Sequence, residues 1–121
     1  MNLLNETVKA LAEHNKTLKD VLAIQGNSFG MSIEDFIDLS DTEYDSGFGG
    51  ALVADDLVII GDNWWLERAE YDGSEWWEYK EKPKILPIRD DLYALTILQS
   101  HDKKLLYWQS LASINGIEEK K

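Results

Sequence analysis

Residues 61–80 read GDNWWLERAEYDGSEWWEYK, and this stretch decides the fold. It holds four of the five tryptophans as two adjacent pairs, one on each side of an Asp-Gly dipeptide at positions 72 and 73. Asp-Gly favours the two-residue turn of a β-hairpin. Because neighbouring residues of a strand point to opposite faces of the sheet, each pair places one tryptophan on each face. We therefore predict a β-hairpin with large aromatic side chains on both faces.

A two-residue turn would pair Tyr71 with Ser74 and fix every pair beyond them. One face of the hairpin would then suit a core, with Arg68 able to lie over the ring of Trp77. The large side chains expected on this core face are Trp64, Leu66, Trp77 and Tyr79.

The opposite face of the hairpin would carry Trp65 and Trp76 among acidic residues. In this register Glu67 lies directly opposite Glu78, and like charges so placed destabilise a sheet. A three-residue turn with a glycine bulge would shift the pairing by one residue, set Glu67 opposite Trp77 and remove that repulsion. The sequence leaves both registers open. In either one, an aromatic pair is covered by the C-terminal segment or exposed as an anchor for a partner.

Helical periodicity marks the N-terminus. Leu4, Val8 and Leu11 recur at helical spacing, which predicts an amphipathic helix over residues 3–14 that stops at Asn15. A second helix is predicted over residues 33–44, with an almost wholly acidic outer face.

Turn residues and apolar runs place the other elements before the tryptophan hairpin. Residues 21–32 read as a short hairpin around Gly-Asn-Ser at 26–28. Ser32, three residues before Asp35, forms an acidic variant of a capping box at the start of the second helix. The glycine-rich residues 45–50 end that helix, and the apolar run at 57–60 predicts a buried strand.

The C-terminal third is ambiguous. After a linker bracketed by Pro83 and Pro87, its leucine and alanine content allows two helices, whereas its β-branched and aromatic residues allow a hairpin. We favour a helix for 90–99 and leave 104–113 open.

Together these elements predict an α+β fold: an antiparallel sheet of about four to five strands with helices packed on one face. At 121 residues the chain is expected to form a single domain, 1–121, with an acidic α+β body over 1–83 and a C-terminal extension over 84–121.

Composition narrows the class of protein. The absence of cysteine excludes disulfides, thiol catalysis and thiolate metal sites. No apolar run approaches the roughly 18 residues of a membrane span. The N-terminus also lacks the apolar core of a signal peptide, so we expect a soluble, intracellular protein.

The net charge of −11 is concentrated in the middle of the chain. Between residues 20 and 78 there are 15 acidic residues and one basic residue, Arg68. Such a segment repels phosphate backbones, which argues against direct nucleic-acid binding. It would be attracted to a basic surface, including one built to hold nucleic acid.

Motifs of common catalytic and metal sites are incomplete. Residues 41–47, DTEYDSG, partly follow a calcium loop, but the glycine comes one position late and Leu52 stands where a bidentate glutamate is needed. Neither His14 nor His101 has a spaced partner for zinc or the context of a nucleophile. The facing glutamates of the hairpin are interpreted as a chance pairing. We therefore expect no enzyme, no catalytic residues, no cofactor and no metal.

Three stretches carry a resemblance to a known group of proteins: EYDSGFGG (43–50), DLVIIGDNWWLE (56–67) and EYDGSEWWEYK (70–80). Through them, roughly residues 31–83 resemble small uncharacterised proteins encoded by phages and prophages of Firmicutes. The resemblance implies an origin in a mobile element and a location in the cytoplasm of the bacterial host. It implies no mechanism and no functional residues.

The acidic middle and this resemblance lead to one functional hypothesis. We expect a non-enzymatic, acidic phage-type binding protein, an anti-defence (anti-CRISPR-like) inhibitor that acts as a DNA mimic on a basic nucleic-acid-binding surface. Its partner would be a host protein such as a CRISPR or other defence nuclease. The candidate partner-binding residues are Trp65, Trp76, Glu67, Glu78, Asp35, Asp38, Asp41, Glu43 and Asp45.

Two alternatives stay open. The first is a small structural or regulatory phage protein that self-associates through its tryptophan face. The second is an enzyme or a ligand pocket lined by tryptophan and glutamate.

Overall fold

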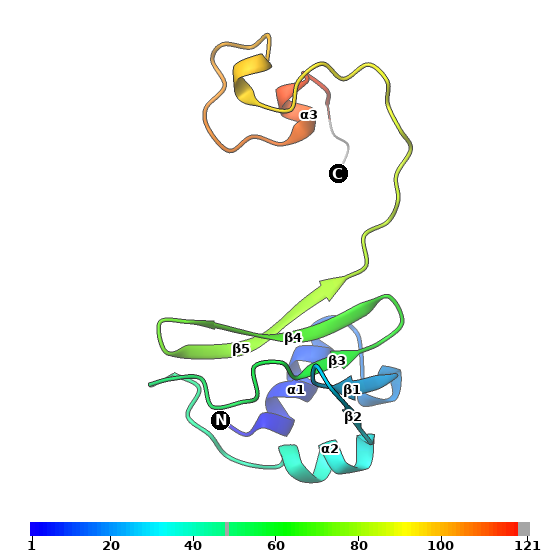
Figure 1. Ribbon diagram of the computed structural model, residues 1–121, viewed down its shortest axis with the longest axis vertical. Helices are drawn as coiled ribbons and strands as arrows, with labels where there is room; N and C mark the ends of the chain where they lie inside the picture. The colour runs from blue at the N-terminus through cyan, green and yellow to red at the C-terminus, as the bar shows by residue number, and fades with distance from the viewer. Residues whose placement is uncertain (48, 119–121) are drawn as a thin grey trace. The chain divides into compact units, whose positions relative to one another are not determined.

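The computed structural model describes residues 1–47 and 49–118 (Figure 1). The chain divides into two compact units, Met1–Pro83 and a second unit that begins at Lys84. Each unit is compact by itself. The expectation that the two form a single domain stays a prediction.

The first unit contains a five-stranded antiparallel sheet, so the expected α+β fold is confirmed. The order of the strands across the sheet is β2-β1-β3-β4-β5. Their bounds are β1 Ala23–Gln25, β2 Gly30–Met31, β3 Val58–Ile60, β4 Trp64–Tyr71 and β5 Ser74–Glu81.

Helices α1 (Leu3–Ala12) and α2 (Ile33–Ser40) pack on the same side of this sheet (Figure 1). A short 3₁₀ helix, η1 (Leu18–Asp20), precedes β1. We call the helix-covered side of the sheet the inner face and the opposite side the outer face.

The tryptophan hairpin adopts the register of a two-residue turn. Tyr71 pairs with Ser74, and the pairing continues without a bulge to Trp64 opposite Glu81. Asp72 has φ of 51° and Gly73 has φ of 83°. Positive φ at both central residues is what a type I′ turn requires. The alternative three-residue turn is therefore wrong.

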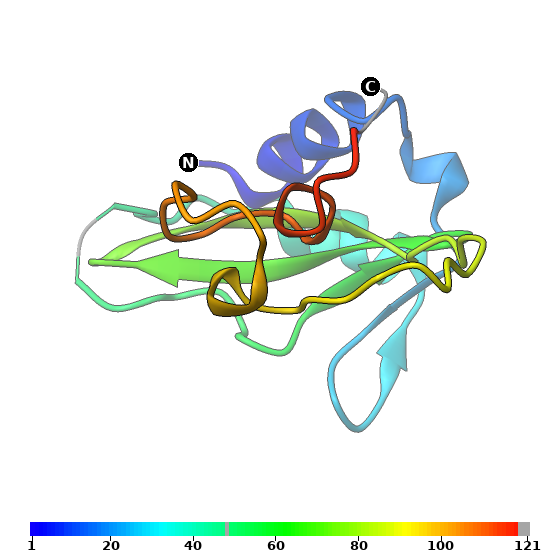
Figure 2. The ribbon, with the colours of Figure 1, turned by 90° about the horizontal axis from the view of Figure 1, so that it is seen from above.

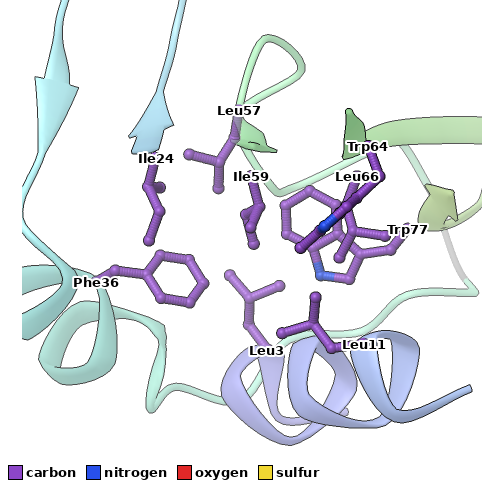
Figure 3. Close-up of a cluster of buried hydrophobic side chains, with 9 residues drawn as sticks. All are labelled: Leu3, Leu11, Ile24, Phe36, Leu57, Ile59, Trp64, Leu66 and Trp77. Carbon is purple, nitrogen blue, oxygen red and sulfur yellow. The ribbon is translucent and has the colours of Figure 1, made fainter. Parts of the chain in front are cut away.

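This register sends the predicted core residues inward. Trp64, Leu66 and Trp77 are buried, and the partly buried Tyr79 stacks on the ring of His14 with centroids 3.7 Å apart. They join side chains from both helices and from β1 and β3 (Figure 3). The buried cluster consists of Leu3, Leu11, Ile24, Phe36, Leu57, Ile59, Trp64, Leu66 and Trp77.

The buried stripe of α1 differs from the one expected. Thr7 is fully buried, whereas Val8, which the apolar pattern placed inside, is 46% exposed. The Thr7 hydroxyl donates to the carbonyl of Leu3 at 2.7 Å and accepts the indole N–H of Trp77 at 2.9 Å. A polar residue can be buried here because its hydrogen bonds are satisfied.

α1 ends at Ala12, two residues earlier than predicted, and Asn15 has the role of a stop signal expected of it. Its φ of 59° lies in the left-handed region, and the next N–H, of Lys16, donates to the carbonyl of Leu11 at 2.9 Å. This is the bonding of a Schellman motif, in which asparagine is an accepted substitute for glycine.

The segment from β1 to α2 follows the sequence prediction in outline. β1 and β2 form the expected short hairpin, and the Ser32 side chain accepts the N–H of Asp35 at 3.0 Å. However, α2 ends at Ser40, four residues earlier than predicted. Tyr44 lies beyond the helix, where its hydroxyl is hydrogen-bonded to Glu6.

The second unit contains two short helices, η2 (Ile97–Gln99) and α3 (Leu111–Ile114). Within its described residues, 84–118, there is neither a helix spanning 90–99 nor a strand, so both expectations for this region are wrong. Side-chain bonds to the backbone replace regular structure: the Asn115 amide accepts the N–H groups of Tyr93 and Ala94 and donates to the Ala94 carbonyl.

The approach of Gly61 to Trp64 gives a test of the core. A Cβ atom at Gly61 would lie 2.0 Å from the indole of the buried Trp64. We predict that Gly61→Ala lowers the free energy of unfolding by about 1–3 kcal/mol, because the indole or the backbone must shift. Urea denaturation followed by tryptophan fluorescence measures the change.

Gly50→Ala is the matched control, because its Cβ would meet nothing within 4 Å. It should alter the free energy of unfolding by less than about 1 kcal/mol. Equal destabilisation by the two substitutions would contradict the packing described.

Candidate functional site

The outer face of the hairpin gathers the aromatic and acidic residues that the sequence singled out. They alternate along β4 and β5 with the core residues, and they are half-buried or exposed because α1 and α2 pack on the other side. The outer-face residues of the hairpin are Trp65, Glu67, Ala69, Tyr71, Ser74, Trp76, Glu78 and Lys80.

The facing glutamates of this surface are bridged by a lysine. Glu67 does lie opposite Glu78, as the two-residue register predicts. The Lys80 Nζ atom lies 3.7 Å from a carboxylate oxygen of Glu67 and 3.5 Å from one of Glu78. The expected repulsion is thereby offset, which explains why the register needs no bulge. All three side chains are 40–47% exposed, so each ion pair contributes little to stability.

Two tryptophans flank this charged group. Trp65, half-buried, pairs with Lys80 across the strands and donates its indole N–H to Glu67 at 3.3 Å. Trp76 lies on the other side, opposite Ala69, and is 41% exposed. An exposed tryptophan beside carboxylates is typical of a residue that anchors a protein interface, since tryptophan combines a large apolar area with one hydrogen-bond donor.

The acidic candidates of residues 35–45 do not join the outer face. α2 carries Asp35 and Asp38 and packs on the inner side, where Phe36 enters the core (Figures 1 and 3). The segment after α2 is tied to the N-terminus, since Glu43 pairs with the terminal amine at 3.3 Å and Asp41 accepts the side-chain N–H of Asn2. The structure thus separates the predicted contact residues into two groups. The candidates outside the two strands of the hairpin are Asp35, Asp38, Asp41, Glu43 and Asp45. Of these, Asp45 precedes Ser46, whose carbonyl accepts the N–H of Glu75 in β5.

A buried charge cluster around Arg68 lies on the inner face. The Arg68 side chain is only 4% exposed, and its guanidinium donates to Glu6 at 3.2 Å, to Glu75 at 2.8 Å and to the Tyr44 hydroxyl at 3.2 Å. Tyr44 in turn donates to Glu6. The guanidinium also lies 4.7 Å from the centroid of Trp77, as the sequence predicts.

Protonation in this cluster follows from burial and hydrogen bonding. Burial, aided by the bond to Glu6, raises the pKa of Tyr44 to about 12. Burial alone would raise the pKa of Glu75, but the N–H groups of Leu52 and Val53 and the Arg68 guanidinium outweigh it and lower that pKa. At neutral pH Tyr44 is therefore neutral and Glu75 charged.

Sequence reasoning did not find the partners of Arg68. The sequence did place Arg68 on the core face of the predicted hairpin. A buried cation needs a carboxylate, so this position indicates that Arg68 has an acidic partner. Because this region holds so many acidic residues, the pattern alone does not select Glu6 and Glu75. We interpret the cluster as a structural tie between α1, the segment after α2 and the hairpin.

A cavity of about 490 Å³ lies beside this cluster. Arg68 and Glu75 line it, but each is already bonded to the other. Within residues 1–47 and 49–118, no three histidine, aspartate or glutamate side chains are placed to hold a metal ion. In the same part of the chain, no helix has the length and apolar character needed to cross a membrane.

Comparison with known proteins gives no match: neither a family model, nor a curated protein, nor a solved structure matches the chain. The resemblance to phage proteins stays a hypothesis. The geometry of the outer face and its charge therefore carry the functional argument.

The pKa of Glu75 leads to a prediction about stability. Glu75→Gln should lower the free energy of unfolding at pH 7 by about 3 kcal/mol, because it breaks a buried ion pair. A lowered pKa in the folded state means that the carboxylate stabilises above its unfolded pKa of about 4.3 and less as pH falls below it. The difference between the wild type and the variant should therefore shrink between pH 5 and pH 3.

Urea denaturation at several pH values measures this difference. Glu78→Gln, in the same strand but half-exposed, serves as the control and should cost less than about 1 kcal/mol at any pH. A Glu75→Gln effect that does not change with pH would contradict the assignment.

Proposed function

We propose that this protein is a non-enzymatic binding protein whose outer face docks on a basic surface of another protein. The observation that supports the proposal best is the arrangement of Trp65 and Trp76 on either side of Glu67 and Glu78, on the sheet face away from the helices. The tryptophans would supply apolar contact area, and the carboxylates would pair with lysine or arginine of the partner.

The charge of the first unit supports a basic partner. Residues 1–83 contain 18 acidic and six basic residues. The electrostatic field of these residues would speed encounter with a positive surface. Burial of Trp65 and Trp76 in the contact would slow dissociation of the complex. Asp35 and Asp38, which do not lie on the outer face, would contribute to this field without touching the partner.

A narrower form of the proposal concerns the identity of the partner. Surfaces that hold nucleic acid are basic, so an acidic protein that covers one would exclude DNA or RNA by competition. The resemblance to phage and prophage proteins favours a host defence nuclease, and hence an anti-CRISPR-like role in the bacterial cytoplasm. This narrower form rests on the resemblance together with the charge.

Self-association through the outer face is the alternative function, and the exposed Trp76 is the observation that favours it. Two copies would bring together net charges of −11 each, which opposes it at low salt. Light scattering, which gives the molecular mass in solution, distinguishes self-association from binding of a basic partner. A stable dimer that Trp76→Ala converts to monomer would support self-association.

The outer-face proposal predicts the behaviour of a double variant. A partner is first captured on the immobilised full chain from nuclease-treated bacterial lysate, and its binding kinetics are then measured with the purified pair. Trp65→Ala/Trp76→Ala should weaken binding by at least about thirtyfold, mainly through faster dissociation, because both anchors are lost. Glu67→Gln/Glu78→Gln should mainly slow association and reduce its salt dependence.

Phe29→Ala is the matched control, because it removes an aromatic side chain that is 78% exposed and precedes β2 at the far edge of the sheet. It should leave the affinity unchanged. The proposal would be wrong if the tryptophan variant bound as tightly as this control. Failure of DNA to compete with the protein for its partner would contradict the narrower form alone.

A further inference from the structure

β5 is an edge strand of the sheet, because β4 is the one strand that pairs with it within residues 1–47 and 49–118. In a hairpin with a two-residue turn, the residues that flank the turn exchange hydrogen bonds, and the bonded pairs then alternate along the strands. Glu75, Trp77, Tyr79 and Glu81 therefore direct their N–H and C=O groups away from β4.

One part of this edge is already covered by the chain itself. The N–H of Glu75 donates to the carbonyl of Ser46 at 2.8 Å, which shows that the outward groups accept a neighbouring segment. For Trp77, Tyr79 and Glu81, the structure of residues 1–47 and 49–118 shows no backbone hydrogen bond to a segment outside the hairpin. We call these three residues the open edge.

A groove begins at one end of the open edge. Helix α1 packs next to β5 (Figure 2, α1 in dark blue and β5 in light green). A groove of about 320 Å³ along their junction reaches Trp77 of the open edge, whereas Tyr79 and Glu81 do not line it. The small side chain of Ala10 on α1 leaves room there for the side chains of an added strand. The groove is lined by Met1, Asn5, Glu6, Lys9, Ala10, Glu13, Glu75, Trp76 and Trp77.

The charges around the groove select the kind of strand that would fit. Glu13, which follows α1, lines the groove, and Glu78 and Glu81 are exposed residues of β5 itself. The nearby Lys80 is already shared between two glutamates. On the outer face, every second side chain of a strand added here would lie next to Trp76 or Glu78. These positions suit lysine or arginine, which can lie over the indole or pair with the carboxylate. A second copy of this chain suits the edge poorly, because both copies carry a large negative charge.

We propose that the open edge of β5 accepts an extended, lysine- or arginine-bearing segment of the partner as a sixth strand of the sheet. Backbone hydrogen bonds to Trp77, Tyr79 and Glu81 would hold the segment, and the glutamates would select its charge. The inference rests on the proposed function, since it names the chemistry of a segment of the same partner. The outer face and the added strand would form one continuous contact surface.

The test uses the full chain and a defined probe: a fluorescent peptide of about eight residues in which lysine alternates with threonine. Binding is measured by fluorescence anisotropy at low salt. Amide hydrogen exchange at saturation should show slower exchange at Trp77, Tyr79 and Glu81, and unchanged exchange at Trp76 and Glu78. A peptide with glutamate in place of lysine should bind at least about tenfold more weakly.

Glu81→Pro tests the backbone contact, because proline removes an N–H that points away from β4 and spares the ladder of the hairpin. It should weaken peptide binding about tenfold, the worth of one or two hydrogen bonds. Glu81→Ala is the matched control, which loses the same charge but keeps the N–H, and should lose less than about threefold. Circular dichroism checks the fold of both variants.

Four results would overturn the inference. They are unchanged exchange at Trp77 and Tyr79 with saturating peptide, equal binding by the two variants, equal affinity for the lysine and glutamate peptides, and a dimer that Glu81→Pro dissociates. The first and third are independent of any protein variant, and the fourth would assign the edge to a second copy.

The two proposals can fail separately. If Glu81→Pro binds the captured partner as tightly as the wild type while Trp65→Ala weakens binding, the outer-face proposal stands and the edge inference is overturned. If the lysine peptide protects the open edge but no basic protein is captured, the edge inference stands and the proposed function fails.

Discussion

The register of the β4–β5 hairpin is the constraint on which the rest of the first unit depends. Asp72 and Gly73 both adopt positive φ, and this turn sets every pair out to Trp64 and Glu81. Because side chains alternate between faces, a slip of one residue would turn Trp64 to solvent and bring the outer-face residues against the helices. The same turn therefore decides both the composition of the core and that of the candidate binding face.

Arg68 makes this register costly to change. A buried guanidinium is tolerated only where carboxylates compensate it, and here Glu75 comes from the neighbouring strand and Glu6 from a helix 62 residues away in sequence. A slipped hairpin would move Arg68 to the opposite face and leave two carboxylates without their cation. The Arg68 Nε–H has no hydrogen-bond partner among the described residues, and the guanidinium lies over the ring of Trp77. The cluster thus favours one pairing of the strands as well as joining distant segments.

The parts of the fold that could be predicted from sequence are the local ones. The Asp-Gly turn, the alternation of faces and the stop at Asn15 each depend on a few neighbouring residues, and the structure confirms them. The burial of Thr7 depends on a bond to Trp77, 70 positions away, so a hydrophobic pattern gives no sign of it. The bridging role of Lys80 was accessible in principle, since the two-residue register places it on the same face as both glutamates.

The secondary structure of the C-terminal region was predicted wrongly for a different reason. Leucine, tyrosine and tryptophan suggest regular structure only when a core exists to bury them. In the second unit Trp108 is fully exposed and Tyr107 is 88% exposed, while Ala94 and Ile114 are its buried apolar residues. Without a packed face to favour helix or strand, local bonds such as those of Asn115 determine the backbone. For the candidate site the limit was similar: the sequence shows that acidic residues cluster, but not that α2 lies on the opposite side of the sheet from Trp65 and Trp76.

The outer face and the open edge meet along β5, and their chemistry bears on a general hazard of such sheets. An exposed apolar face next to an unpaired edge invites association with another copy. Here Glu67 and Glu78 lie on the outer face and Glu81 lies at the open edge, and the net charge of −11 repels an identical chain. Repulsion of this kind depends on the sign of the partner's charge, so it disappears when the incoming surface is basic. The charge that protects the sheet from its own copies is therefore the same charge that would admit a lysine- or arginine-bearing partner.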